Sequence, residues 1–231
     1  MLIHKKLVPA MAALAFSLPA SATSFTLDFE GVGNLARILD FYNGGTDSAG
    51  HRGPDYDVTF GSNALGLIDR DVGGDGNIAN EPSPSTTMIF LNGSSVLNYA
   101  PGFSDGFSFY YSTVARDADV SVYDGLNATG NLLGSIHLSA LGFGHGDPTG
   151  DYGNWVAAGL SFNGIAKSID FNGTANYVTY DNITFGSAEP GTGSGFAGAV
   201  PEPEAYALML AGCGVVGLRL RRRQLTEAAV A

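Results

Sequence analysis

The stretch Asp119-Val120-Ser121-Val122-Tyr123-Asp124-Gly125 indicates the fold class of this 231-residue chain. Two valines alternate with Asp119, Ser121 and Tyr123, which is the period of two expected of a strand with one buried face. The dipeptide Asp124-Gly125 follows at once, and such a pair favours a tight turn between strands. A short strand closed by a turn is therefore the unit from which this chain is expected to be built.

The same unit recurs on both sides of this stretch. Near the N-terminus, Phe25, Leu27 and Phe29 alternate with polar residues, and Asn172-Gly173 is a second tight-turn dipeptide. Further strand candidates, most of them bounded by Gly, Asn, Asp or Pro, are residues 58–61, 86–91, 106–112, 132–138, 155–162, 166–171 and 177–185. Residues 34–42 are ambiguous and also fit one helical turn. Nine or ten short strands without a long helical pattern predict an all-β fold, a jelly-roll-type β-sandwich over residues 23–187.

The first 22 residues have the pattern of a secretory signal peptide. Lys5 and Lys6 form a basic start, an apolar run extends from Leu7 to about Leu18, and Ala20-Ser21-Ala22 is a small-residue cleavage pattern. The alternative is a buried N-terminal helix, but nothing downstream is patterned to pack against one. The sequence predicts export through the secretion translocon, followed by cleavage by signal peptidase.

The C-terminal end has a second membrane-directed pattern. After a Gly/Pro/Ser-rich segment expected to be a flexible linker (188–199), Pro201, Glu202 and Pro203 precede an uncharged run from Ala205 to Leu218. Fourteen helical residues span about 21 Å, less than the ~30 Å hydrocarbon core. A basic cluster follows, and its long side chains can reach the cytoplasmic surface: Arg219, Arg221, Arg222 and Arg223. The pattern predicts a short transmembrane helix with residues 224–231 as a cytoplasmic tail.

Residues 200–223 resemble the PEP-CTERM sorting signal of exported bacterial proteins. The resemblance implies recognition by an exosortase, a membrane protease or transpeptidase that cuts near Pro-Glu-Pro. It also implies transient anchoring in the inner membrane with the body on the periplasmic side, and then delivery to the cell surface or extracellular matrix. The alternative is a proline-rich linker with a permanent tail anchor. Cys213 departs from the usual core of this signal, and we interpret it as a small apolar residue, not a lipidation site.

The charge of the body limits its partners. Between the signal peptide and Val200 the chain has nineteen acidic and five basic side chains, a net charge of −14. A nucleic-acid partner is disfavoured because phosphate binding requires the opposite sign. The one cysteine lies in the predicted membrane helix, so the body is expected to hold together by packing or by a metal, without a disulfide.

The body also resembles galactose-binding-like, carbohydrate-binding jelly rolls. The stretches that carry this likeness are residues 53–60, 105–111, 122–125 and 180–186. In such folds the first and last strands often lie close together and share a structural Ca²⁺. The resemblance implies Glu30 and Asp181 as ligands here, with Asp28 as a third. The alternative is that these are solvent-facing carboxylates.

Other candidate sites are weaker. The loop from Asp69 to Asn77 opens like an EF-hand, but Gly73 at position five and Asn80 at position twelve leave two ligands missing, which favours a solvated turn. His145, near Asp147 and Asp151, is a weak metal candidate. Trp155, the only tryptophan, follows polar residues and is a candidate sugar platform, with core packing as the alternative.

Three functional classes follow. The sequence shows no catalytic motif of standard spacing, which favours a non-enzymatic exported β-sandwich with a structural or adhesive role. The alternative is a carbohydrate-binding module for an extracellular polysaccharide. A secreted hydrolase is the third class, because paired carboxylates for glycoside hydrolysis meet only in space.

Overall fold

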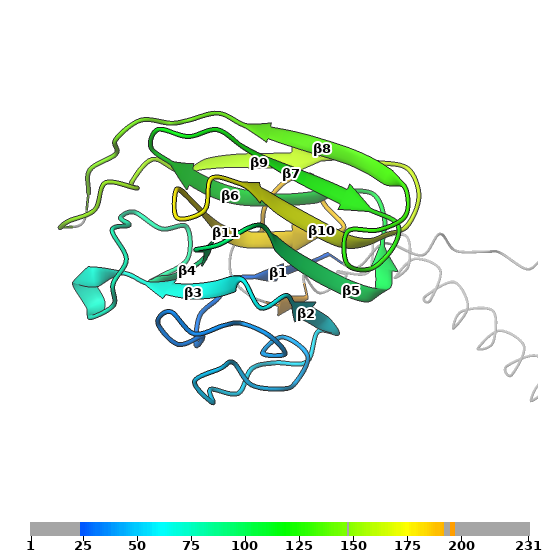
Figure 1. Ribbon diagram of the computed structural model, residues 1–231, viewed down its shortest axis with the longest axis horizontal. Helices are drawn as coiled ribbons and strands as arrows, with labels where there is room; N and C mark the ends of the chain where they lie inside the picture. The colour runs from blue at the N-terminus through cyan, green and yellow to red at the C-terminus, as the bar shows by residue number, and fades with distance from the viewer. Residues whose placement is uncertain (1–23, 147, 192–194, 197–231) are drawn as a thin grey trace, which may run out of the picture.

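The computed structural model describes residues 24–146, 148–191 and 195–196. It is a two-sheet β-sandwich with one short 3-10 helix (Figure 1). Its elements are β1 Phe25–Leu27, β2 Val58–Phe60, β3 Ala64–Ile68, η1 Arg70–Val72, β4 Thr86–Phe90, β5 Ser95–Phe103, β6 Phe107–Thr113, β7 Ala118–Tyr123, β8 Leu132–Leu138, β9 Val156–Leu160, β10 Ala166–Gly173, β11 Val178–Phe185 and β12 Gly195–Phe196. The predicted all-β sandwich is confirmed.

The chain passes from one sheet to the other at most of its connections. One sheet has the order β2-β5-β10-β7-β8, and the other contains β9, β6, β11, β4, β3, β1 and β12, every pair being antiparallel. Along one edge, β11 pairs with β6; along its other edge, it pairs with both β4 and β1. The first strand, β1, and the last long strand, β11, are therefore neighbours, as the jelly-roll resemblance implies.

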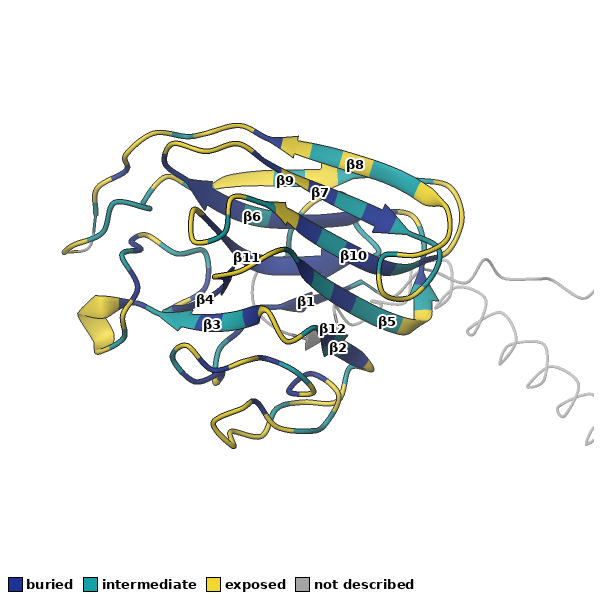
Figure 2. Cartoon of the chain, in the orientation of Figure 1, coloured by how far each residue is buried: buried dark blue, intermediate teal, exposed yellow. Residues whose placement is uncertain are grey.

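Aromatic side chains fill the space between the two sheets. The rings of Phe25 and Phe185 stack at 4.4 Å between centroids, which ties β1 to β11. Phe109, Phe171 and Tyr180 form edge-to-face contacts across the sandwich. Figure 2 shows buried residues along β6, β10 and β11, with more exposed residues on β8 and β9. With the one cysteine outside this region, apolar burial is what holds the body together.

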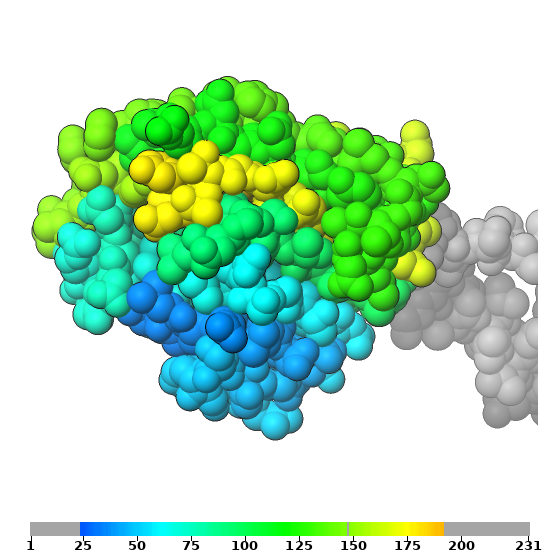
Figure 3. Space-filling view, in the orientation of Figure 1, coloured from blue at the N-terminus to red at the C-terminus, as the bar shows by residue number. Residues whose placement is uncertain are grey.

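Residues 29–57 form a looped lobe instead of the helical turn considered for 34–42 (Figure 3). Leu35 and Leu39 have positive φ angles of 53° and 49°, which a right-handed helix does not allow. The amides of Leu35 and Ile38 donate to carbonyls of β3, so the strand edge takes the hydrogen bonds that a helix would form internally. The helical interpretation was wrong.

Two further differences concern strands and the C-terminal segment. The sequence pattern did not indicate β3 or β5, and β12 lies within residues 188–199, which were predicted to be a flexible linker. β12 pairs with β1, so the sandwich continues beyond residue 187. In the part of the chain that the structure describes, no helix has the length and apolar composition that a membrane span requires. The predicted signal peptide, Pro-Glu-Pro motif, membrane helix and arginine cluster lie outside the described residues and stay predictions.

Candidate functional site

A cleft of about 490 Å³ lies over β3, β4 and the start of β11. Apolar side chains from these strands, Leu67, Ile89 and Val178, contribute to its lining. Loops supply most of the rest: Leu35, Asp75, Asn77, Ile78, Leu91, Tyr152 and Asn176, with Thr179 from β11. An apolar surface with a few polar groups and one aromatic ring is the usual composition of a small-ligand site.

Two loops that are distant in sequence form one wall of the cleft. Ile78 and Tyr152 form a parallel β-bridge, and the amides of Asp151 and Tyr152 both donate to the Asn77 carbonyl. The Asn77 side chain donates in turn to an Asp151 carboxylate oxygen at 3.0 Å. Figure 3 shows the loop after β3 lying beside the loop that precedes β9. The main-chain pairing places Asn77 and Tyr152 together in the cleft.

Trp155 holds this wall in place and is not one of the residues that line the cleft. Its indole N–H donates to the Ala79 carbonyl at 2.9 Å, and the ring is half-buried. This contact joins the start of β9 to the loop that carries Asn77 and Ile78. Tyr152, three residues earlier, is the aromatic residue among those that line the cleft. A direct ligand role for Trp155 stays a prediction.

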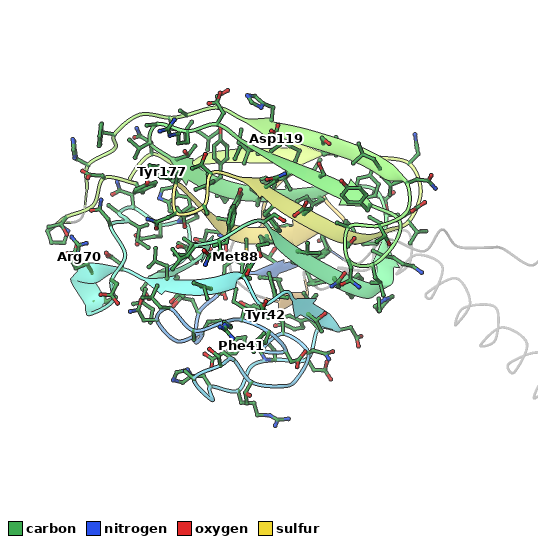
Figure 4. All side chains as sticks on the ribbon, in the orientation of Figure 1. Phe41, Tyr42, Arg70, Met88, Asp119 and Tyr177 are labelled. Carbon is green, nitrogen blue, oxygen red and sulfur yellow. The ribbon has the colours of Figure 1, made fainter. Side chains whose placement is uncertain are left out.

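Asp75 is the one acidic residue among those that line the cleft. The Asn34 side chain donates to its Oδ2 at 2.6 Å, and Asn34 Oδ1 accepts from the amides of Ile68 and Asp75. The carboxylate is therefore positioned by an amide that is itself tied to the end of β3. Arg70 and Tyr177, labelled in Figure 4, lie at the same end of the sandwich. Burial, together with Tyr177 and Asp151, raises the pKa of the Tyr152 hydroxyl, which stays neutral at physiological pH.

The three residues predicted to bind calcium lie in one region, joined by residues 83–86. Asp181 is fully buried and accepts hydrogen bonds from the Ser83 amide and hydroxyl and from the Asn182 amide, all at 2.7–2.9 Å. Glu30 accepts from the amides of Ser85 and Thr86 and from the Ser85 hydroxyl. Protein donors thus already bind both of these carboxylates.

Asp28 belongs to the same region through its backbone and side chain. Its carbonyl accepts from the Ser83 hydroxyl, and its carboxylate accepts from the Glu30 amide. Burial raises the pKa of Asp181 to about 7, with a contribution from the negative charge of Asp28 and against the hydrogen bonds from Ser83 and Asn182. In the described part of the chain, no group of three or more acidic, His or Cys side chains is arranged to hold a metal ion. Calcium binding stays a prediction.

The loop that resembles an EF-hand is a turn whose acidic residues bind different partners. Asp69 caps η1 by accepting from the Asp71 amide, while Asp71 accepts from the amide and hydroxyl of Thr149. Asp75 is held by Asn34. The weak metal candidate His145 lies 3.8 Å from Asp151, and Asp147 is outside the described residues. The solvated-turn interpretation agrees with these contacts.

Comparison with known proteins gives matches only among solved structures. No protein-family model matches the chain, and no curated protein matches it. The chain is similar to the family 6 carbohydrate-binding module CBM6cm-2 of Cellvibrio mixtus lichenase 5A, solved with cellotriose (12% identity over 54% of this chain and 86% of that one, TM-score 0.33). It is also similar to the C-terminal CBM6 of LamC from Zobellia galactanivorans (16%, 54% and 100%, TM-score 0.30).

A third match is the K3 cleaved adhesin domain of Lys-gingipain from Porphyromonas gingivalis, with 16% identity over 73% of this chain and 93% of that one and a TM-score of 0.28. Similarity at this level assigns no ligand and no site residue. Function is inferred below from the residues of the cleft.

Proposed function

We propose that the body of this protein binds a carbohydrate in the cleft formed by β3, β4, β11 and the loops around residues 75–78 and 152. The observation that carries the proposal is the combination of Tyr152 with Asp75, Asn77 and Asn176 in one cleft of about 490 Å³. A sugar has one apolar face and many hydroxyls, so it needs an aromatic or aliphatic surface with fixed hydrogen-bonding groups beside it.

Binding without hydrolysis is the better-supported chemistry for this cleft. Glycoside hydrolysis requires two carboxyl groups on either side of the scissile bond. Asp75 is the one carboxylate among the described residues that line the cleft. Asp151, on the neighbouring loop, is engaged by the Asn77 amide and is not among those lining residues. We therefore favour a binding module over a secreted hydrolase.

Affinity electrophoresis of the full chain through gels containing polysaccharides tests this function. We expect at least one polysaccharide to retard the protein, and we expect Tyr152→Ala to abolish the retardation. Tyr123→Ala is the matched control, because Tyr123 is a half-exposed tyrosine on β7 in the other sheet. Unchanged mobility in every gel would favour the structural or adhesive role instead. Equal loss in both variants would place binding outside the cleft.

We also propose that the protein is exported and sorted to the cell surface or extracellular matrix by an exosortase-type system. The support is the order of features in the sequence: a signal peptide over residues 1–22, and then Pro201-Glu202-Pro203, an uncharged run and an arginine cluster at the other end. A carbohydrate-binding body would attach the processed protein to extracellular polysaccharide.

A further inference from the structure

The charge around the cleft points to a more specific ligand, an inference that rests on the proposed carbohydrate binding. None of the described residues that line the cleft is basic, and Asp75 among them is acidic. Asp151 lies on the wall loop, and Asp71 lies on the adjoining turn beside Arg70, where Thr149 holds Asp71. A uronate or other anionic polysaccharide would bring like charge against these carboxylates.

The Asp75 carboxylate has hydrogen-bonding capacity left for a cationic ligand. It is exposed, and its Oδ2 accepts a hydrogen bond from the neutral Asn34 amide. By contrast, the buried Asp181 and Asp47 each accept several donors. A carboxylate with one neutral donor has lone pairs left for a charge-assisted hydrogen bond from a ligand.

The rest of the molecule reinforces the same preference. The body has a net charge of −14, which raises the local concentration of cations and repels polyanions. Tyr152 adds a neutral aromatic ring to the same cleft, and a ring face attracts an ammonium group as well as a sugar face. Asn77 and Asn176 supply neutral groups suited to hydroxyls.

We propose that the cleft binds a polysaccharide of amino sugars with free amines, in which Asp75 pairs with the ammonium group while Tyr152 contacts the sugar ring. The ligand class is a partly or fully de-N-acetylated glucosamine-type polymer. N-acetylation converts the ammonium group that Asp75 recognises into a neutral amide. A neutral glucan has no such group.

Titration calorimetry of the full chain with short glucosamine oligosaccharides, their N-acetylated forms and a neutral glucan oligosaccharide tests the proposal. Short ligands limit the non-specific attraction between a polycation and an acidic protein. We expect the amine form to bind about tenfold more tightly than the N-acetylated form, the ratio typical of one charged hydrogen bond. The preference should shrink as salt rises.

Two isosteric variants distinguish recognition by the Asp75 carboxylate from general attraction to the net negative charge of the protein. Asp75→Asn should remove the preference for the amine, whereas Asp105→Asn removes the same charge from a distant turn and should leave the preference unchanged. Equal weakening in both variants would overturn the proposal in favour of bulk attraction. Equal affinity of the wild-type chain for amine and N-acetylated forms would also overturn it while leaving carbohydrate binding intact. Failure of every sugar, including the neutral one, would count against the proposed function itself.

Discussion

At the scale of single residues, Asp181 makes stability depend on pH. Burial raises the pKa of this carboxyl from 3.8 to about 7. Between these values the folded state holds a proton that the unfolded chain releases, so the folded state binds more protons. The free energy of unfolding therefore falls as pH rises from about 4 to about 7, by on the order of 4 kcal/mol at most, and this contribution is level above that range.

Thermal unfolding from pH 4.5 to pH 8 measures this effect. We expect the melting temperature of the wild-type chain to fall across the window and Asp181→Asn to flatten the fall. The amide oxygen of asparagine still accepts from the Ser83 amide, and other titrating groups, such as His137 beside Asp119, are the same in both proteins. Parallel curves for the two proteins would assign the pH dependence to those other groups.

Asp181, together with Asp28 and Glu30, is also where a bound metal ion and protein hydrogen bonds can be told apart as the source of stability. If Ca²⁺ bound Asp28, Glu30 and Asp181, a chelator would lower the melting temperature, and added calcium would lower the pKa of Asp181. The donors from Ser83, Ser85 and Thr86 already bind two of these carboxylates. A lower melting temperature in chelator than in calcium would establish the metal, and equal melting temperatures would assign the local order to these hydrogen bonds.

At the scale of elements, one indole hydrogen bond couples the start of β9 to the cleft wall. Trp155→Phe keeps a ring but leaves the Ala79 carbonyl without this donor. We expect a loss of about 1 to 2 kcal/mol in the free energy of unfolding and weaker sugar binding, because the loop with Asn77 and Ile78 is less restrained. Chemical denaturation measures the first effect and calorimetry the second.

Phe143→Leu, at a residue that is 67% exposed, is the control and should change stability little. Full stability in Trp155→Phe would show that the wall is held by its backbone pairing alone.

A glycine permits the close contact between the two wall loops. Gly150 has φ of 142°, and an added Cβ would collide with the Ile78 carbonyl. Gly150→Ala should therefore cost about 1 to 3 kcal/mol and displace the loop that carries Tyr152. Gly61→Ala, where the nearest atom would lie at 3.4 Å, should cost less. Similar melting temperatures for both variants would contradict this account of the wall.

The strands that could be predicted were those with a clear local pattern in the sequence. Alternating runs and turn dipeptides identified nine strands, including β7 and β8. The pattern failed at β5, which contains Pro101-Gly102 and a register shift opposite β10, and at β3, which Gly66 interrupts. The cleft was beyond such reasoning, because Ile78, Tyr152 and Asn176 meet only through long-range pairing. The loops around residues 69–77 and 151–155 were recognised as polar and unusual, but not as one site.

At the scale of the whole molecule, the C-terminal segment continues the sandwich before it reaches the predicted sorting signal. Ser108 donates to the Ser187 carbonyl, Gly191 donates to the Thr184 hydroxyl, and β12 pairs with β1. The connection to residue 200 thus begins on the packed surface of the sheet. Residues 188–191 and 195–196, which were predicted to belong to a flexible linker, are therefore part of the body.

The sorting prediction is tested in the whole cell. Replacing Pro201, Glu202 and Pro203 together by alanine should leave the body folded, because none of the described strands and loops of the sandwich contains them, and should block C-terminal processing. We expect the unprocessed protein to stay with the inner membrane, held by the uncharged run and the arginine cluster, while the wild-type protein reaches the surface or medium. Membrane fractionation with immunoblotting measures both outcomes.

The control replaces Pro148, a proline in a loop of the body, and should be processed normally. Normal processing and localisation of the triple variant would refute the sorting role of Pro-Glu-Pro, and carbohydrate binding would then have to account for surface attachment without it.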